Sequence, residues 1–172
     1  MTVYVAFLRA VNVGGYGKLA MRDLAELAAD CGFRSVKTYI QSGNLVFSSE
    51  LSQNEVKAVL EAALKDFVGA EVPVLVRMPQ ELRNMLSECP FREATGNRVG
   101  FVIADEVDPD EVELRGTKDE EVVFGGSAIF VHFPSGMGAS RLKFAGLSSE
   151  TMRNRNTVEK MAALASELGP QP

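Results

Sequence analysis

Cysteine and histidine are scarce in this chain of 172 residues, which contains two cysteines and one histidine. Cys31 and Cys89 fall in different predicted elements without metal-type spacing, so we expect free, buried thiols rather than a disulfide or a zinc site. Free thiols suit the reducing cytoplasm, which is the predicted location. The single histidine, His132, alternates with Val131 and Phe133 in a predicted strand. We therefore assign it a structural role and exclude metal sites built on His and Cys.

Long hydrophobic runs and an excess of positive charge are also missing. The apolar stretch Val3–Leu8 ends at Arg9 and is too short for a signal segment or a membrane span, so we expect no membrane partner. A net charge of −5 argues against nonspecific binding to duplex DNA. Residues 105–121 carry nine acids and two bases, whereas residues 134–160 carry five bases and two acids. We interpret the acidic stretch as a solvated face and the basic stretch as a candidate site.

The first half of the chain alternates strand and helix signals. Hydrophobic periodicity, a capping box at Ser52 and Glu55, and the stop signal Gly32 define the elements. They are a strand at Val3–Leu8, a helix from Met21, a hairpin of Val36–Ile40 with Leu45–Phe47, a helix after Ser52, and a strand at Val72–Met78, where Pro73 indicates a sheet edge. The predicted order is β-α-β-β-α-β, which places the exit of the first strand and the turn Gln41–Asn44 at one end of the sheet.

The second half repeats this pattern more loosely. We predict a helix at Pro79–Ser87, a strand at Val99–Ile103, a short acidic helix at Pro109–Leu114, a hairpin of Val122–Phe124 with Ala128–Phe133, and a last helix capped by Asn156 that ends at Gly169. The fold prediction is therefore α+β, with two intertwined, duplicated ferredoxin-like (β-α-β-β-α-β) halves at residues 1–78 and 79–172 that form one compact unit.

The first candidate site is the glycine-rich loop between Arg9 and Lys18. A P-loop fails because Asn12 and Leu19 stand where that motif needs Gly and Ser or Thr. A dinucleotide fingerprint fails because no acid follows the next strand, so no cofactor is identified. What remains is a strand exit whose backbone N–H groups suit an anion. A purely conformational role for the glycines fits this loop equally well.

Two further clusters combine amides, hydroxyls and bases. Gln41, Ser42 and Asn44 can hydrogen-bond a planar or sugar-like ligand, although for this cluster alone a simple turn is favoured. The other cluster contains Arg141 and the segment Arg153–Thr157, which precedes a helix N-terminus that favours anions. The helix dipole disfavours the cations of this segment, and this local cost indicates a role for them.

Three segments together resemble domain-of-unknown-function family 1697. They are Leu8-Arg9-Ala10-Val11-Asn12-Val13-Gly14-Gly15, Thr38-Tyr39-Ile40-Gln41-Ser42-Gly43-Asn44-Leu45-Val46-Phe47, and Arg153-Asn154-Arg155-Asn156-Thr157-Val158. The resemblance implies a duplicated ferredoxin-like fold and no particular substrate. The chain departs from the family pattern at Ala10, where Gly is usual, at Arg141, where Lys is common, and at Arg155, where Trp is typical. The last departure favours anion pairing over stacking.

These observations predict a cytoplasmic binding protein for an anionic small molecule or nucleotide. The predicted ligand-binding residues are Arg9, Asn12, Gly14, Gly15, Lys18, Gln41, Ser42, Asn44, Arg141, Arg153, Asn154, Asn156 and Thr157. One alternative is an enzyme of phosphoryl or acyl chemistry that relies on the arginines and loop amides. Another is a single-stranded nucleic-acid module, which is disfavoured because Tyr39 and Phe47 are expected in the core.

Overall fold

The computed structural model describes residues 1–9, 19–147 and 149–169, which form an α+β protein with antiparallel sheets. The chain divides into two units, one of Met1–Gln80 with Met161–Pro172 and the other of Glu81–Lys160. The first unit contains β1 (Thr2–Leu8), α1 (Met21–Asp30), β2 (Arg34–Tyr39), β3 (Asn44–Ser49), α2 (Gln53–Val68) and β4 (Val74–Arg77). The predicted β-α-β-β-α-β order of the first half is therefore observed.

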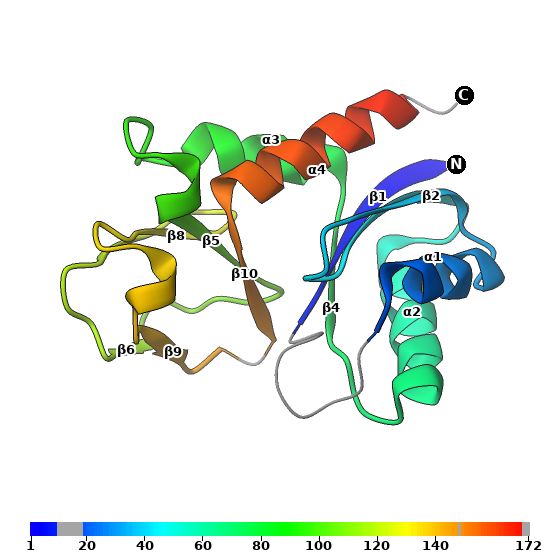
Figure 1. Ribbon diagram of the computed structural model, residues 1–172, viewed down its shortest axis with the longest axis horizontal. Coiled ribbons are helices and arrows are strands. Elements are labelled where there is room, and N and C mark those ends of the chain that lie inside the picture. The colour runs from blue at the N-terminus through cyan, green and yellow to red at the C-terminus, as the bar shows by residue number, and fades with distance from the viewer. Residues whose placement is uncertain (10–18, 148, 170–172) are drawn as a thin grey trace. The chain divides into compact units, whose positions relative to one another are not determined.

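The sheet of the first unit has the strand order β2-β3-β1-β4, and every neighbouring pair is antiparallel. Helices α1 and α2 cover the same face of this sheet (Figure 1). Their core contacts come from Leu24 of α1 and from Leu60 and Leu64 of α2, and all three are fully buried against strand residues such as Phe47. Burial of these apolar side chains is the main force that joins the helices to the sheet.

Local signals set the start of α2 and the end of α1 as predicted. The hydroxyl of Ser52 accepts a hydrogen bond from the Glu55 N–H at 3.4 Å, and the Glu55 carboxylate accepts one from the Ser52 N–H at 2.8 Å. This complete capping box begins α2. Gly32, with φ of +87°, follows α1. Phe67, near the end of α2, is 55% exposed.

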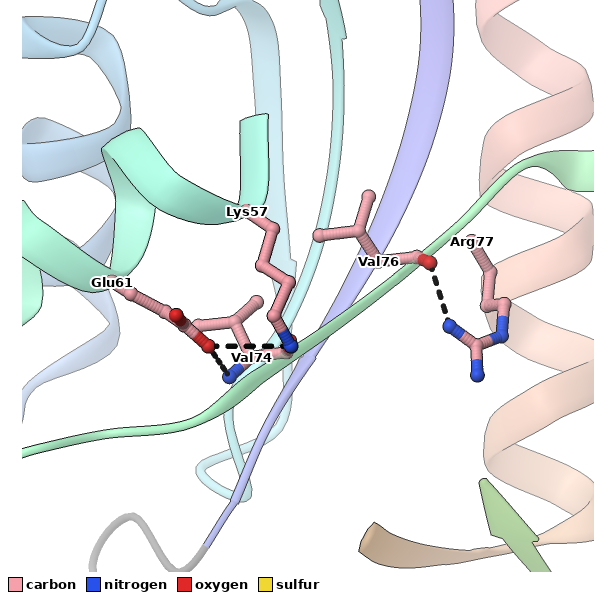
Figure 2. A network of polar contacts seen from close by, with 5 residues as sticks. All are labelled: Lys57, Glu61, Val74, Val76 and Arg77. Atoms are coloured by element: carbon pink, nitrogen blue, oxygen red, sulfur yellow. Dashed lines mark hydrogen bonds and ion pairs between the residues drawn. The ribbon is translucent and has the colours of Figure 1, made fainter. Parts of the chain in front are cut away.

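Strand β4 lies at a sheet edge, which confirms the prediction from Pro73. Both backbone polar groups of Val74 are bonded by side chains of α2. Lys57 Nζ donates to the Val74 carbonyl, and Glu61 Oε1 accepts from the Val74 N–H, each at 2.9 Å (Figure 2). Gln53 Nε2 donates to the Val76 carbonyl at 2.7 Å. A row of side chains one helical turn apart therefore takes the place of a neighbouring strand on this edge.

The second unit contains most of α3 (Pro79–Glu88), a 3₁₀ turn at Gly96–Arg98, β5 (Val99–Ala104), β6 (Glu113–Arg115), β7 (Glu121–Phe124), β8 (Ile129–His132), a 3₁₀ turn at Met137–Ala139, β9 (Lys143–Ala145), β10 (Glu150–Asn154) and the start of α4 (Arg155–Leu168). One sheet has the order β10-β5-β8-β7, and β6 pairs with β9 in a second sheet. The predicted hairpin of β7 and β8 is confirmed.

The acidic helix predicted at residues 109–114 is wrong. Residues 109–111 form a turn in which Asp108 Oδ1 accepts a hydrogen bond from the Asp110 N–H at 3.0 Å, and the chain then enters β6. Pairing of β6 with β9, about thirty residues away, overrides the local preference for helix. Since residues 105–120 contain no helix, the second unit does not repeat the β-α-β-β-α order of the first. In the described parts of the chain, no helix has the length and apolar character needed to cross a bilayer.

Candidate functional site

The exit of β1 and the turn between β2 and β3 lie together at one end of the first unit's sheet. The Leu8 N–H donates to the Gly43 carbonyl at 2.8 Å, and Phe7 pairs with Asn44 in the strand register. On the other side of β1, the Arg9 N–H donates to the Pro73 carbonyl at 3.0 Å. The prediction that the exit of β1 and the turn lie at one end of the sheet is thus confirmed by the contact of Leu8 with Gly43.

Asn44 holds this turn together from inside the protein. Its side chain is fully buried, and Nδ2 donates to the Tyr39 carbonyl at 2.8 Å and to Ser42 Oγ at 2.9 Å. A Cβ on Gly43, whose φ is +84°, would come within 2.9 Å of Leu8 Cβ. Asn44 and Gly43 therefore shape the turn, as favoured from the sequence. Gln41, which is exposed, and the half-buried Ser42 stand at its surface.

The N-terminus of α1 faces the same end of the sheet. Strands β1 and β2 are both antiparallel to β3 and hence parallel to each other, so the connecting helix runs back between them and begins where β1 ends. Its N-cap residue is Ala20, whose side chain cannot accept a hydrogen bond from the first turn. Backbone N–H donors of this kind favour an anion. Four predicted site residues, Asn12, Gly14, Gly15 and Lys18, lie outside the described residues.

The third predicted cluster belongs to the second unit. Arg153 of β10 is 7% exposed, and its guanidinium donates to Thr151 Oγ1 at 2.6 Å and to the Met152 carbonyl at 3.1 Å. Burial lowers the pKa of Arg153 from its usual value to about 10. Arg153 is thus a desolvated cation with internal hydrogen-bond acceptors rather than an exposed arginine.

The cap of the last helix is Asn154, and the prediction of Asn156 was wrong. Asn154 Oδ1 accepts a hydrogen bond from the Thr157 N–H at 2.9 Å, and α4 begins at Arg155. Thr157 is buried. The exposed Asn156 instead lies over Gly96, where an added Cβ would collide with its side-chain amide. Two residues predicted to bind a ligand therefore have structural roles. Asn154 caps the helix, and Asn156 packs on Gly96.

Arg155 also has a structural duty that the sequence analysis did not anticipate. Its guanidinium donates to the carbonyls of Phe91 at 2.6 Å and Ala94 at 2.5 Å, in the loop after α3, and pairs with Glu159 at 3.5 Å. These bonds explain why a cation is tolerated at the N-terminus of α4, where the helix dipole disfavours positive charge. The argument that this cost indicates ligand binding is wrong for Arg155.

The loop before Arg141 faces acids. Ser135 Oγ donates to Asp119 Oδ2 at 2.5 Å, and Ser140 Oγ donates to Glu120 Oε1 at 2.6 Å. The hydrogen bonds from Ser140 and from the Lys118 N–H hold the pKa of Glu120 below its usual value. These residues line an open concavity of about 410 Å³. Part of the basic stretch therefore meets part of the acidic stretch, which argues against an anion at residues 135–140. Arg141 itself is exposed.

The imidazole and thiol groups of the chain belong to His132, Cys31 and Cys89. His132 is half-buried in β8, where Nδ1 lies 3.2 Å from Glu121 Oε1 and the ring lies 5.5 Å from that of Phe91. Cys31 is half-buried and Cys89 is buried, and both thiols are free. No group of three or more His, Cys, Asp or Glu residues suited to a metal occurs in the part of the chain that the structure describes.

Two contributions to the structure were missed from the sequence. The helical spacing of Lys57 and Glu61 shows that they lie on one face of α2. Nothing in the sequence identifies the backbone of β4 as their hydrogen-bond partner. The concavity beside Asp119 and Glu120 was missed because these acids were assigned to a solvated face. Its serines come from the stretch with the opposite charge, so only the tertiary structure brings the two together.

Comparisons with known proteins give a family and a similar solved structure, and neither description names an activity. The model of a family described as "Protein of unknown function (DUF1697)" matches residues 1–130, a range that includes the first two sequence motifs and ends before the third. The solved structure of conserved bacterial protein SP0830 from Streptococcus pneumoniae is similar, with a TM-score of 0.74 and 25% identity over 95% of this chain and 98% of that chain. No curated protein matches the chain significantly.

Proposed function

This chain belongs to the DUF1697 family of proteins of unknown function, and we propose that it is a cytoplasmic binding protein for an anionic small molecule or nucleotide. The proposed site is the end of the first unit's sheet, and we call it the turn site. It consists of Arg9, the turn residues Gln41 and Ser42, and the N-terminus of α1. The observation that carries the proposal is the 2.8 Å hydrogen bond from the Leu8 N–H to the Gly43 carbonyl, which holds the residue before Arg9 against the turn.

The chemistry of the turn site suits an anion with a polar body. Arg9 supplies a guanidinium, which pairs with carboxylate or phosphate oxygens through two parallel hydrogen bonds. The first turn of α1 supplies backbone N–H groups and the positive end of the helix dipole. Gln41 supplies an amide that both donates and accepts hydrogen bonds, as recognition of a sugar or base requires. Asn44 fixes the turn in place before any ligand arrives, which lowers the entropy that binding must overcome.

The nucleic-acid alternative is weakened by Phe47 of the same sheet, whereas Tyr39, also expected in the core, is half-buried. Phe47 is fully buried and stacks on Phe33, with ring centroids 4.4 Å apart and an interplanar angle of 8°. A ring that is already stacked in the core does not offer a face to an extruded base. A small ligand at the sheet end therefore fits better than a strand laid across the sheet.

Thermal-shift and calorimetric titration with nucleotides, sugar phosphates and dicarboxylates test the proposal. A ligand that binds only the folded state raises the unfolding midpoint in proportion to the logarithm of its concentration. We expect Arg9→Ala to abolish the shift. The matched control is Arg34→Ala, which removes the same charge from an exposed position at the opposite end of β2. If no compound produces a shift that Arg9→Ala removes and Arg34→Ala retains, the proposal is wrong.

A further inference from the structure

The turn site contains a backbone conformation that its sequence does not favour. Ile40, the first residue of the turn, has a φ of +49°. This left-handed region is a rare and costly place for a β-branched residue, because Cβ approaches the backbone oxygen. Gly43, at the other end of the same turn, has a φ of +84° and is the residue type that tolerates such angles. Gly or Asn at position 40 would adopt this positive φ at a lower cost than Ile.

Burial does not compensate for this strain. Ile40 is 49% exposed, which makes it one of the most exposed large apolar side chains of the described chain. The turn is held by Asn44, whose hydrogen bonds to the Tyr39 carbonyl and Ser42 Oγ involve no atom of the Ile40 side chain. A strained backbone at an exposed side chain, with no burial to compensate for it, motivates the hypothesis of a functional role.

The position of Ile40 places this apolar contact beside the polar groups of the turn site. Ile40 directly follows Tyr39, which pairs with Asn44, and Asn44 pairs in turn with Phe7 at the end of β1. The cation of Arg9, the amide of Gln41 and the aliphatic side chain of Ile40 therefore belong to the same end of the sheet, with β3 between the two strands that they follow. A simple anion uses only the first of these groups. A ligand that uses all three has an anionic group joined to a flat, weakly polar ring.

We propose that Ile40 is a ligand-contacting residue that packs against the base of a nucleotide, whose phosphate is held by Arg9. This inference rests on the proposed function and narrows it to nucleotides over inorganic anions and sugar phosphates. When the ring of a ligand covers a half-exposed aliphatic side chain, the affinity for that ligand rises with the apolar area removed from water. The strain at Ile40 is then retained because the side chain serves binding, as is common for outliers at functional sites.

The test compares Ile40→Gly and Ile40→Asn with Ile40→Val and the unchanged chain. Both Gly and Asn tolerate a positive φ, so these two variants relieve the strain while removing the aliphatic contact. Val keeps the branched side chain. The probes are AMP, ATP and GTP, with ribose 5-phosphate and inorganic pyrophosphate as ligands without a base, and all affinities are measured by isothermal titration calorimetry.

We expect Ile40→Asn to be no less stable than the unchanged chain and to bind at least one nucleotide about tenfold more weakly. Pyrophosphate affinity should be unchanged in every Ile40 variant, and Ile40→Val should retain nucleotide affinity. If Ile40→Gly and Ile40→Asn bind nucleotides as tightly as the unchanged chain does, the proposed role of Ile40 is wrong. Binding that depends on Arg9 would not be affected by that result. Failure of every probe to bind the unchanged chain would overturn both this inference and the proposed function.

Discussion

Glu61 Oε1 accepts a hydrogen bond from the backbone N–H of Val74 at 2.9 Å, so a helix side chain satisfies the donor that an edge strand would otherwise offer to another chain. Lys57 completes the arrangement by bonding the Val74 carbonyl at 2.9 Å and pairing with Glu61 at 3.4 Å (Figure 2). Val74 itself is fully buried. Lys57 and Glu61 therefore protect the edge strand β4 from pairing with another chain.

Replacing Glu61 tests this role of the α2 side chains. Glu61→Ala leaves the buried N–H of Val74 without its acceptor, and we expect a loss of about 1–3 kcal/mol in the free energy of unfolding. Urea denaturation followed by circular dichroism measures the loss. Glu26→Ala is the control, because Glu26 is an exposed helix residue whose ion pair with Arg22 is long, at 3.7 Å. It should change stability by less than about 0.5 kcal/mol. Similar losses in the two variants would contradict the role of Glu61.

Two variants of the turn distinguish residues that stabilise it from residues that contact a ligand. Asn44→Ala removes two buried hydrogen bonds, so we expect a loss of about 2 kcal/mol in the free energy of unfolding. Gln41→Ala, three residues away and exposed, should leave stability within about 0.5 kcal/mol while weakening any ligand shift. Chemical denaturation of both variants provides the comparison. A larger loss of stability in Gln41→Ala than in Asn44→Ala would show that the turn is held in another way.

Two substitutions test which asparagine, Asn154 or Asn156, caps the N-terminus of α4. Asn154→Ala removes the acceptor of the Thr157 N–H and should lower the free energy of unfolding by about 1 kcal/mol. Asn156→Ala removes no cap and should have an effect below about 0.5 kcal/mol. Thermal denaturation of the two variants in parallel measures both effects. The reverse order of stabilities would restore Asn156 as the cap.

The capping box of α2 predicts a pH dependence of stability. Hydrogen bonds from the Ser52 backbone and side chain lower the pKa of the exposed Glu55 carboxyl from its usual 4.5. A folded-state pKa below the unfolded value means that the ionised carboxylate favours folding. This contribution is fully present above about pH 4.5 and is lost as pH falls through the folded-state pKa.

Ser52→Ala removes the side-chain partner, so we expect the pKa of Glu55 to move back toward 4.5 and stability to depend less on pH in this range. NMR titration of the Glu55 carboxyl measures the pKa, and denaturation at several pH values measures the stability. Ser166→Ala is the control for loss of a helix hydroxyl, because Ser166 Oγ donates to the Ala162 carbonyl and caps no N-terminus. A Glu55 pKa that stays unchanged in Ser52→Ala would contradict the assignment.

Elements with strong local signals were predictable. The capping box of Ser52 and Glu55, the stop at Gly32 and the Gln41–Asn44 turn each depend on residues within a few positions of one another, and all three are observed. The position of the β1 exit beside the turn also followed, because the strand-helix-strand order makes β1 and β2 parallel. These predictions required no knowledge of long-range contacts.

The errors arose where a distant partner decides the outcome. Acidic residues at 109–114 read locally as a helix, but Glu113–Arg115 pairs with Lys143–Ala145. The first residue of α4 is set by where β10 stops pairing with β5, at Asn154, and so the cap falls there and not on Asn156. Arg155 looked costly beside a helix N-terminus until the carbonyls of Phe91 and Ala94 supplied its partners.

The sequence by itself determined the α+β class, the first six elements and the position of the turn beside the exit of β1, since hydrophobic period, caps and turn chemistry are local properties. The tertiary structure decided which polar residues are engaged internally. Asn44, Asn154 and Arg155 have hydrogen-bond partners that no local pattern encodes. It also gave Ile40 its positive φ, because the register of β2 on β3 leaves this residue in the turn.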